Sequence, residues 1–159
     1  MTIRKKIDKS LEWTLVIFMS ILVINVLWQV TSRYIMNSPS SFTDELAGYL
    51  LIWVGLLGAA YVAGRREHLA IDILLQKSSQ RRRYKLEIII SILIILFSVF
   101  VLIIGGSWLA YTRFFLSVRS AALGLPLGFV YLVLPISGIL ITYFDIDNMV
   151  RMIRQNRKN

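Results

Sequence analysis

Cysteine is absent from this sequence of 159 residues, and histidine occurs only once, at His68. The lack of cysteine excludes disulfide bonds and thiolate metal sites, although it does not fix the cellular compartment. One histidine is too few to hold a haem between two helices. The sequence also lacks a nucleophile–base pair, a cluster of metal ligands and a phosphate-binding loop, so we expect neither an enzyme nor a metal site.

Charge is missing from the middle of four long apolar segments, which cover residues 11–29, 45–63, 86–109 and 125–143. Each is near the length of about 20 residues that a helix needs to cross the hydrocarbon core of a bilayer. All nine acidic residues lie at the ends of these segments or in the loops. Ion-coupled carriers commonly place an ionisable group or a broken helix inside the membrane, and many contain two repeated halves. Neither feature is clear here, which argues against a self-sufficient carrier.

Lysine and arginine are scarce in two of the loops. Fifteen of the eighteen lie in the N-terminal arm, the middle loop and the C-terminal tail. The positive-inside rule places these three regions in the cytoplasm. We therefore predict an all-α integral membrane protein, a single domain of residues 1–159 with four transmembrane helices and both termini cytoplasmic. The first apolar segment is too long for a signal peptide and lacks a cleavage site, so we interpret it as an uncleaved span.

The formal net charge of +9 is concentrated beside the predicted spans. This placement favours anionic lipid over nucleic acid as the partner, and Arg81, Arg82 and Arg83 are the expected headgroup contacts. The middle loop mixes apolar and polar residues before this basic run, which predicts a short amphipathic helix in the membrane interface. His68 and Asp72 are four residues apart in this loop and could pair. A lone histidine is more often a surface or capping group than a ligand.

The second span carries a series of small residues, Gly55, Ala59 and Ala63, with Gly48 one heptad earlier on nearly the same face. Small side chains let another helix approach closely, and this close packing drives helix association in lipid. The series predicts a packed face but does not identify the partner.

The first span carries a polar stripe. Asn25, Gln29 and Ser32 share one helical face because they are spaced by four and three residues. Such a stripe could line a path for a substrate or an ion, or it could form hydrogen bonds to a neighbouring helix. We favour contact with another helix.

An acidic pair, Asp44 and Glu45, precedes the second span. Together with Ser41 it fits the start of a helix, where acids are favoured by the helix dipole. It could equally form a docking patch for an external protein, with Arg33 nearby as an internal partner. Both interpretations remain open at this point.

Three features predict irregular or close packing within the spans. Pro135 lies inside the fourth apolar segment and predicts a kink. Gly105 and Gly106 in the third could permit close packing or a bend. Trp53 falls too deep for the aromatic belt at the membrane surface, so we expect it to pack against protein.

Several short motifs follow one another between residues 33 and 72: Arg33-Tyr34, residues 42–49, Trp53 with Gly58-Ala59-Ala60, residues 65–68, and Asp72. In order and spacing they resemble the small membrane subunit of TRAP transporters, the tripartite ATP-independent periplasmic transporters. That family also matches the chain in size, number of spans and topology. The sequence departs from the usual family pattern at Phe42 for tryptophan, Asp44 for glutamate and Gly48 for a basic residue.

The resemblance implies a small (Q-type) scaffold subunit of a sodium-driven, binding-protein-dependent secondary transporter in the bacterial inner membrane. A large multi-span subunit would carry Na+ and an organic acid, such as a dicarboxylate or sialic acid, by an elevator-like movement. A periplasmic binding protein would deliver the acid, and this chain would hold no cofactor. By motif match, the resemblance implies docking of the binding protein for Arg33, Asp44 and Glu45, and a cytoplasmic-loop signature for His68 and Asp72. Our hypothesis for the contact with the large subunit rests on the packing patterns instead, either the small residues of the second span or the polar stripe of the first: Gly48, Gly55, Ala59 and Ala63, or Asn25 and Gln29.

Two other functions remain as alternatives. A small homodimeric four-span exporter would need a glutamate embedded in the first span, whereas Glu12 lies at its edge. A membrane anchor for an electron-transfer complex is disfavoured by the lack of paired histidines, although an anchor that binds only quinone stays open.

Overall fold

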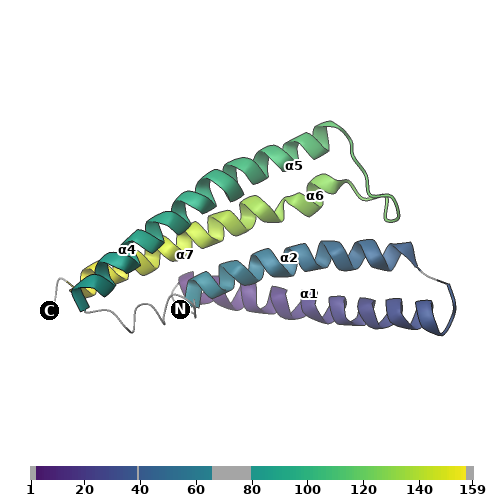
Figure 1. Cartoon of the computed structure of the whole chain (residues 1–159), viewed down its shortest axis with the longest axis horizontal. Helices are drawn as coiled ribbons and strands as arrows, with labels where there is room; N and C mark the ends of the chain where they lie inside the picture. Colours follow the sequence, from purple (N-terminus) through teal and green to yellow (C-terminus); the bar gives the residue numbers. More distant parts are fainter. Residues whose placement is uncertain (1–2, 39, 66–79, 157–159) are drawn as a thin grey trace.

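The chain forms a set of long helices in the computed structural model, which describes residues 3–38, 40–65 and 80–156 (Figure 1). Four helical segments are long and apolar enough to cross a membrane, and they confirm the predicted number of spans. No β-strand occurs in the described part of the chain, where Arg119 and Pro126 form one isolated bridge. The predicted amphipathic helix of the middle loop falls outside these ranges.

Two helical hairpins make up the structure (Figure 1). The helices extend well past the predicted apolar segments, because polar residues at the segment ends continue the helical backbone. α1 begins and α7 ends at one end of the spans, called here the terminal end, whereas α1 and α5 end at the opposite end. The first hairpin comprises α1 (Ile3–Tyr34) and α2 (Ser41–Arg65); the second comprises α4 (Gln80–Phe97), η1 (Ser98–Gly105), α5 (Gly106–Phe115), α6 (Leu127–Tyr131) and α7 (Val133–Asn156).

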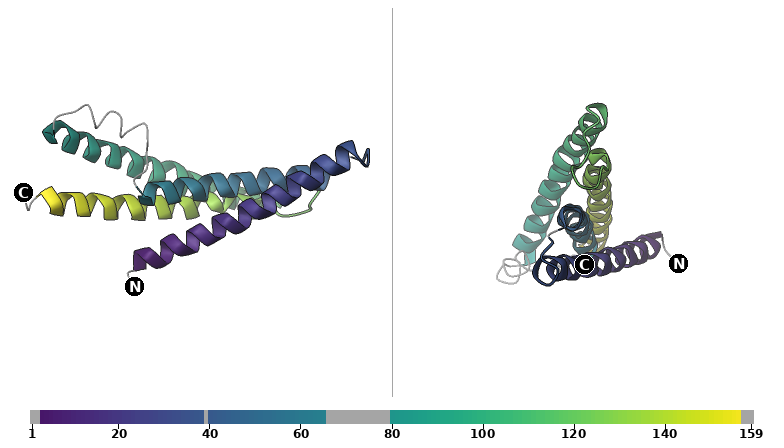
Figure 2. Two further views of the ribbon diagram at one scale, coloured as in Figure 1. Left: turned by 90° about the horizontal axis from the view of Figure 1, so that it is seen from below. Right: turned by 90° about the vertical axis from the view of Figure 1, so that its right-hand side faces the viewer.

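The spans form an open row rather than a closed bundle. α2 packs against α1 on one side and α7 on the other, while α7 also packs against α4 and η1. Within the described ranges, α1 makes no backbone packing with α4, η1, α5 or α7. Figure 2 shows α1 lying oblique to α2 at one edge of the row. This order explains why the spans differ in burial. In the apolar stretch of the fourth span, which packs against several helices, 39% of the residues are buried, against 6% in the first span at the edge.

The hydrophobic core lies where α2 meets α7. Ala60, Val133 and Phe144 are completely buried there. Leu11 reaches this core from α1 and Leu102 reaches it from η1. The predicted packing of Trp53 into protein agrees with its edge contact with the Phe18 ring, at 5.8 Å between centroids. The middle of the row is therefore the part that holds the chain together.

The third span contains an eight-residue π-helix, η1, which the sequence did not predict. It adjoins α7 through glycines that leave no room for a side chain. A Cβ atom added at Gly106 would lie 2.6 Å from Leu134 Cβ, and one at Gly138 would lie 2.8 Å from Leu102 Cβ. The close packing expected near Gly105 and Gly106 is thus present at Gly106.

The fourth span is interrupted between α6 and α7, at Leu132. Pro135 follows three residues later, in the first turn of α7. A proline ring clashes with the carbonyl four residues earlier, here that of Tyr131, the last residue of α6. The predicted kink therefore takes the form of a break between two helices.

Candidate functional site

The polar stripe of α1 contacts the start of α2 at the opposite end of the spans. Asn25 is buried, and its Nδ2 donates to the Thr43 carbonyl at 2.8 Å. Gln29 Nε2 donates to the carboxylate of Asp44. Ser32 is also buried, and its hydroxyl donates to the Gln29 carbonyl within α1. The stripe therefore joins the two helices of the first hairpin. A side-chain amide inside a membrane needs such a hydrogen-bond partner within the protein, because lipid offers none.

Glu45 holds the turn between α5 and α6. Its two carboxylate oxygens accept hydrogen bonds from the backbone amides of Ala121, at 3.0 Å, and Leu123, at 3.2 Å. The turn includes Gly124, whose φ of +64° suits a residue without a Cβ atom. Glu45 thus links the first hairpin to the second across 76 residues of sequence. Sequence reasoning did not predict this contact, because the donors to Glu45 are backbone amides, which residues of almost every type supply.

The residues predicted to dock an external protein share this end of the spans. Arg33 and Asp44 are exposed, and Glu45 is half-buried. Asp44 pairs with Gln29 and Glu45 holds the turn, so both acids contribute to the fold. Arg33 lies in the last turn of α1, where a cation is favoured by the helix dipole.

A second polar cluster forms at the terminal end around Arg4. Its guanidinium forms an ion pair with Asp147 and donates hydrogen bonds to the Asn148 side chain, at 3.0 Å, and to the Gly64 carbonyl. Asn148 Nδ2 in turn donates to the Ala63 carbonyl at 3.0 Å. The last carbonyls of a helix lack partners within it, and here α1 and α7 supply donors to those of α2.

This cluster is the main contact that sequence reasoning missed. The charge count assigned Arg4 to membrane orientation, because nothing local distinguishes it from the neighbouring lysines. Its side chain is only 17% exposed, and its guanidinium lies 5.8 Å from the centre of the Phe144 ring. A spacing of 143 residues between Arg4 and Asp147 leaves no periodic trace in the sequence.

The small residues of α2 share one face but differ in burial along the helix. Ala63 is buried in the core, whereas Gly48, Gly55 and Ala59 are exposed. No atom lies within 4 Å of a Cβ added at Gly48 or at Gly55. We call the surface formed by Gly48, Gly55 and Ala59 the outward face of α2. Among the described residues, no helix packs against this face at Gly48 or Gly55.

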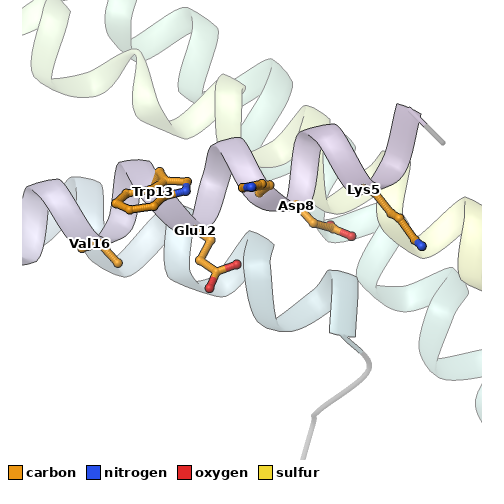
Figure 3. Close-up of a pocket in the computed structure, with 6 residues that line it drawn as sticks. Lys5, Asp8, Glu12, Trp13 and Val16 are labelled. Carbon is orange, nitrogen blue, oxygen red and sulfur yellow. The ribbon is translucent and has the colours of Figure 1, made fainter. Parts of the chain in front are cut away.

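A charged depression lies on the terminal part of α1. Figure 3 shows Lys5, Asp8, Glu12 and Trp13 along it, and Trp13 is 59% exposed. Charged groups followed by an exposed tryptophan are typical of a helix passing from the headgroup region into the hydrocarbon. This surface thus fits contact with the membrane interface.

The remaining predicted residues lie in or beside the middle loop. His68 and Asp72 fall outside the described residues. Arg81, Arg82 and Arg83 begin α4, and only their backbone is described. Among the described residues, no group of three His, Cys, Asp or Glu side chains could hold a metal ion.

Comparison with known proteins identifies the family to which this chain is related. Residues 22–155 match the family described as tripartite ATP-independent periplasmic transporters, DctQ component. The chain belongs to this family. The resemblance predicted from its motifs is thereby confirmed, and the small TRAP subunit is a multi-pass membrane protein by its four candidate spans.

Three relatives illustrate the match. A Haemophilus influenzae protein assigned as a TRAP transporter small permease is 31% identical over 149 residues, which cover 92% of this chain and 89% of the relative. The sialic acid TRAP transporter small permease protein SiaQ of Vibrio cholerae is 23% identical, over 96% of this chain and 86% of SiaQ. A stretch of 71 residues is 37% identical to part of the sialic acid TRAP transporter permease protein SiaT of Haemophilus influenzae, and covers 44% of this chain and 11% of SiaT.

Proposed function

We propose that this small TRAP subunit is a fixed scaffold in a bacterial inner membrane and supports a large permease subunit. That subunit would carry an organic acid with Na+ by an elevator-like movement, after delivery by a periplasmic binding protein. The observation that carries the proposal is the outward face of α2, because small residues exposed to lipid in the middle of a row leave room for another helix. Membership of the family argues against the exporter and the quinone anchor.

The polar contacts of the first hairpin support a scaffold role. Asn25, Gln29 and Arg4 all bond within the chain, and so they fix the helices relative to one another. A moving element would need contacts that break and reform, whereas a fixed support benefits from contacts at both ends of its spans. We therefore assign Asn25 and Gln29 to shaping the hairpin beside the interface, with the outward face of α2 in direct contact with the large subunit.

The relatives support the choice of partner and substrate. SiaT is named as a permease, and a segment of it that makes up 11% of its length matches 44% of this chain, which supports a larger permease as the partner. Two relatives are named for sialic acid, which is an organic acid. We therefore place the substrate in the organic-acid class.

The experiment for the scaffold role is co-purification of the tagged chain with its large subunit from native membranes in mild detergent. Replacing Gly55 by leucine would place a bulky side chain on the outward face of α2 without a clash inside the chain. We expect the affinity for the large subunit to fall about 5- to 150-fold, and its recovery in the eluate to fall with it, since overpacking at a helix contact costs about 1–3 kcal/mol.

The matched control is Leu93→Trp on α4, because Leu93 is 60% exposed at the other edge of the row. It adds bulk toward lipid and should leave co-purification unchanged. Full recovery of the large subunit with Gly55→Leu would contradict the proposed interface.

We further propose that the opposite end of the spans docks the binding protein through Arg33 and Asp44. Arg33 is the better test, because Asp44 also pairs with Gln29. Arg33→Ala should lower substrate uptake when the binding protein is limiting, and uptake by this variant should recover when the binding protein is abundant. Equal uptake at every concentration, with equal amounts of chain in the membrane, would refute the docking role.

A further inference from the structure

A groove of about 430 Å³ lies between α1, α2 and α7 and reaches from Lys6, near the start of α1, to Trp53 at the middle of α2. It exists because α1 and α7 both pack on α2 while their own backbones do not come together within the described ranges. Arg4, two residues before Lys6 on α1, joins this helix to Asp147 of α7. The volume lies within the range of about 300–1,000 Å³ that is usual for small-molecule sites.

The walls of the groove are apolar. Trp53 and Leu57 of α2 and Leu140 of α7 line it. Thr14 of α1 also lines it, but its hydroxyl donates to the Ser10 carbonyl at 2.9 Å within the same helix. The hydroxyl is thus already satisfied and adds no unmet polar group to the wall.

The end of the groove nearest the chain termini is cationic. Lys6 lines this end and is exposed. Among the described residues Lys6 forms no ion pair, in contrast to Arg4 two residues earlier. Lys6 precedes the buried Leu11 by five residues, or about 7.5 Å along the helix axis. The groove therefore presents a cation at headgroup depth and apolar walls below it.

From this order of polarity we infer that the groove binds an anionic phospholipid, with an acyl chain along Trp53 and Leu57 and the phosphate beside Lys6. A phospholipid has its charge and its chain in the same order along the membrane normal. A helix of a partner protein would instead bury the Lys6 ammonium, at a large free-energy cost unless it supplied an acid. The bound lipid would fill the space that the open row leaves between its first and fourth spans.

The test uses the quenching of Trp53 fluorescence by brominated lipid. The other tryptophans, Trp13, Trp28 and Trp108, are more than half exposed and can be replaced by phenylalanine. The full chain is then reconstituted into phosphatidylcholine vesicles that contain a minor fraction of brominated phosphatidylglycerol or of brominated phosphatidylcholine. We expect the anionic lipid to quench more strongly at equal mole fraction.

Two variants and a control separate the headgroup from the chain. Lys6→Gln should reduce the preference for phosphatidylglycerol about fivefold, because one cation near a membrane surface contributes about 1 kcal/mol. Thr14→Phe fills the groove and should lower quenching by both lipids. Lys5→Gln is the control, since Lys5 lies at a similar depth but lines the depression of Figure 3 and not the groove.

Three results would overturn the inference. Equal quenching by the two lipids would show that the groove does not prefer an anionic headgroup. An equal effect of Lys5→Gln and Lys6→Gln would show that any preference comes from the general charge of the surface and not from Lys6. Loss of quenching when the co-purified large subunit is present would show that a partner helix occupies the groove. The scaffold proposal is tested separately at Gly55, so either one can fail while the other stands.

Discussion

Removal of the Arg4 guanidinium should loosen α1 from the rest of the row, and Arg4→Met is the substitution that tests this. Methionine keeps the unbranched stem and its packing but loses every polar contact. Among the described residues, the polar contacts of Arg4 include both an acid of α7 and a carbonyl at the end of α2. Arg4 gives α1 a polar contact with α7, although the backbones of these two helices do not pack together within the described ranges.

The magnitude follows from the contacts. Hydrogen bonds that involve a charged group contribute about 1.5–3 kcal/mol each, but such values do not add. Arg4 is 17% exposed and Asp147 is 28% exposed, so water can replace part of what is lost. Asp147 also keeps its ion pair with Arg151, at 3.0 Å. We therefore expect Arg4→Met to lower the free energy of unfolding by about 2–4 kcal/mol.

The assay is reversible unfolding in mixed detergent micelles, followed by tryptophan fluorescence. A double-mutant cycle with Asp147→Asn isolates the ion pair, and we expect a coupling of about 1–2 kcal/mol, between the values for exposed and buried pairs. Lys5→Met is the control at the neighbouring position. Its side chain lines the depression on α1 rather than the cluster, so its effect should stay within about 0.5 kcal/mol.

Either of two results would refute this reasoning. Equal destabilisation by Arg4→Met and Lys5→Met would show that Arg4 acts only as one more cation near the membrane surface. A coupling below about 0.5 kcal/mol would show that the pair with Asp147 is no stronger than an exposed one.

Two further outcomes are expected from single substitutions. Gly106→Ala should lower the free energy of unfolding by about 1–3 kcal/mol because its Cβ would clash with α7, whereas Gly55→Ala should be neutral or slightly stabilising; equal values would contradict the close contact at Gly106. Glu45→Gln should speed hydrogen exchange at the amides of Ala121 and Leu123 by weakening the bonds to the carboxylate, and unchanged protection there would show that the turn is held by other groups.

The sequence alone determined the class of the protein and its elements. Four apolar segments of suitable length are expected to cross a membrane as helices, because a helix pairs its backbone N–H and C=O groups with one another where no water is present. Pro135 predicted a kink, since a proline inside a helical span removes an amide hydrogen from the ladder and clashes with the preceding turn. The motifs between residues 33 and 72 identified the family, because they record a local order that needs no knowledge of packing.

The tertiary structure alone decided how these helices meet. The row of spans, the π-helix η1 and the cluster at Arg4 depend on contacts between residues far apart in sequence. Helical periodicity cannot report such contacts. The small residues of α2 show the limit most clearly, because their spacing predicted one packed face. The fold buries Ala63 in the core near the terminal end, where α2 meets α7, and leaves Gly48, Gly55 and Ala59 exposed farther along the same face.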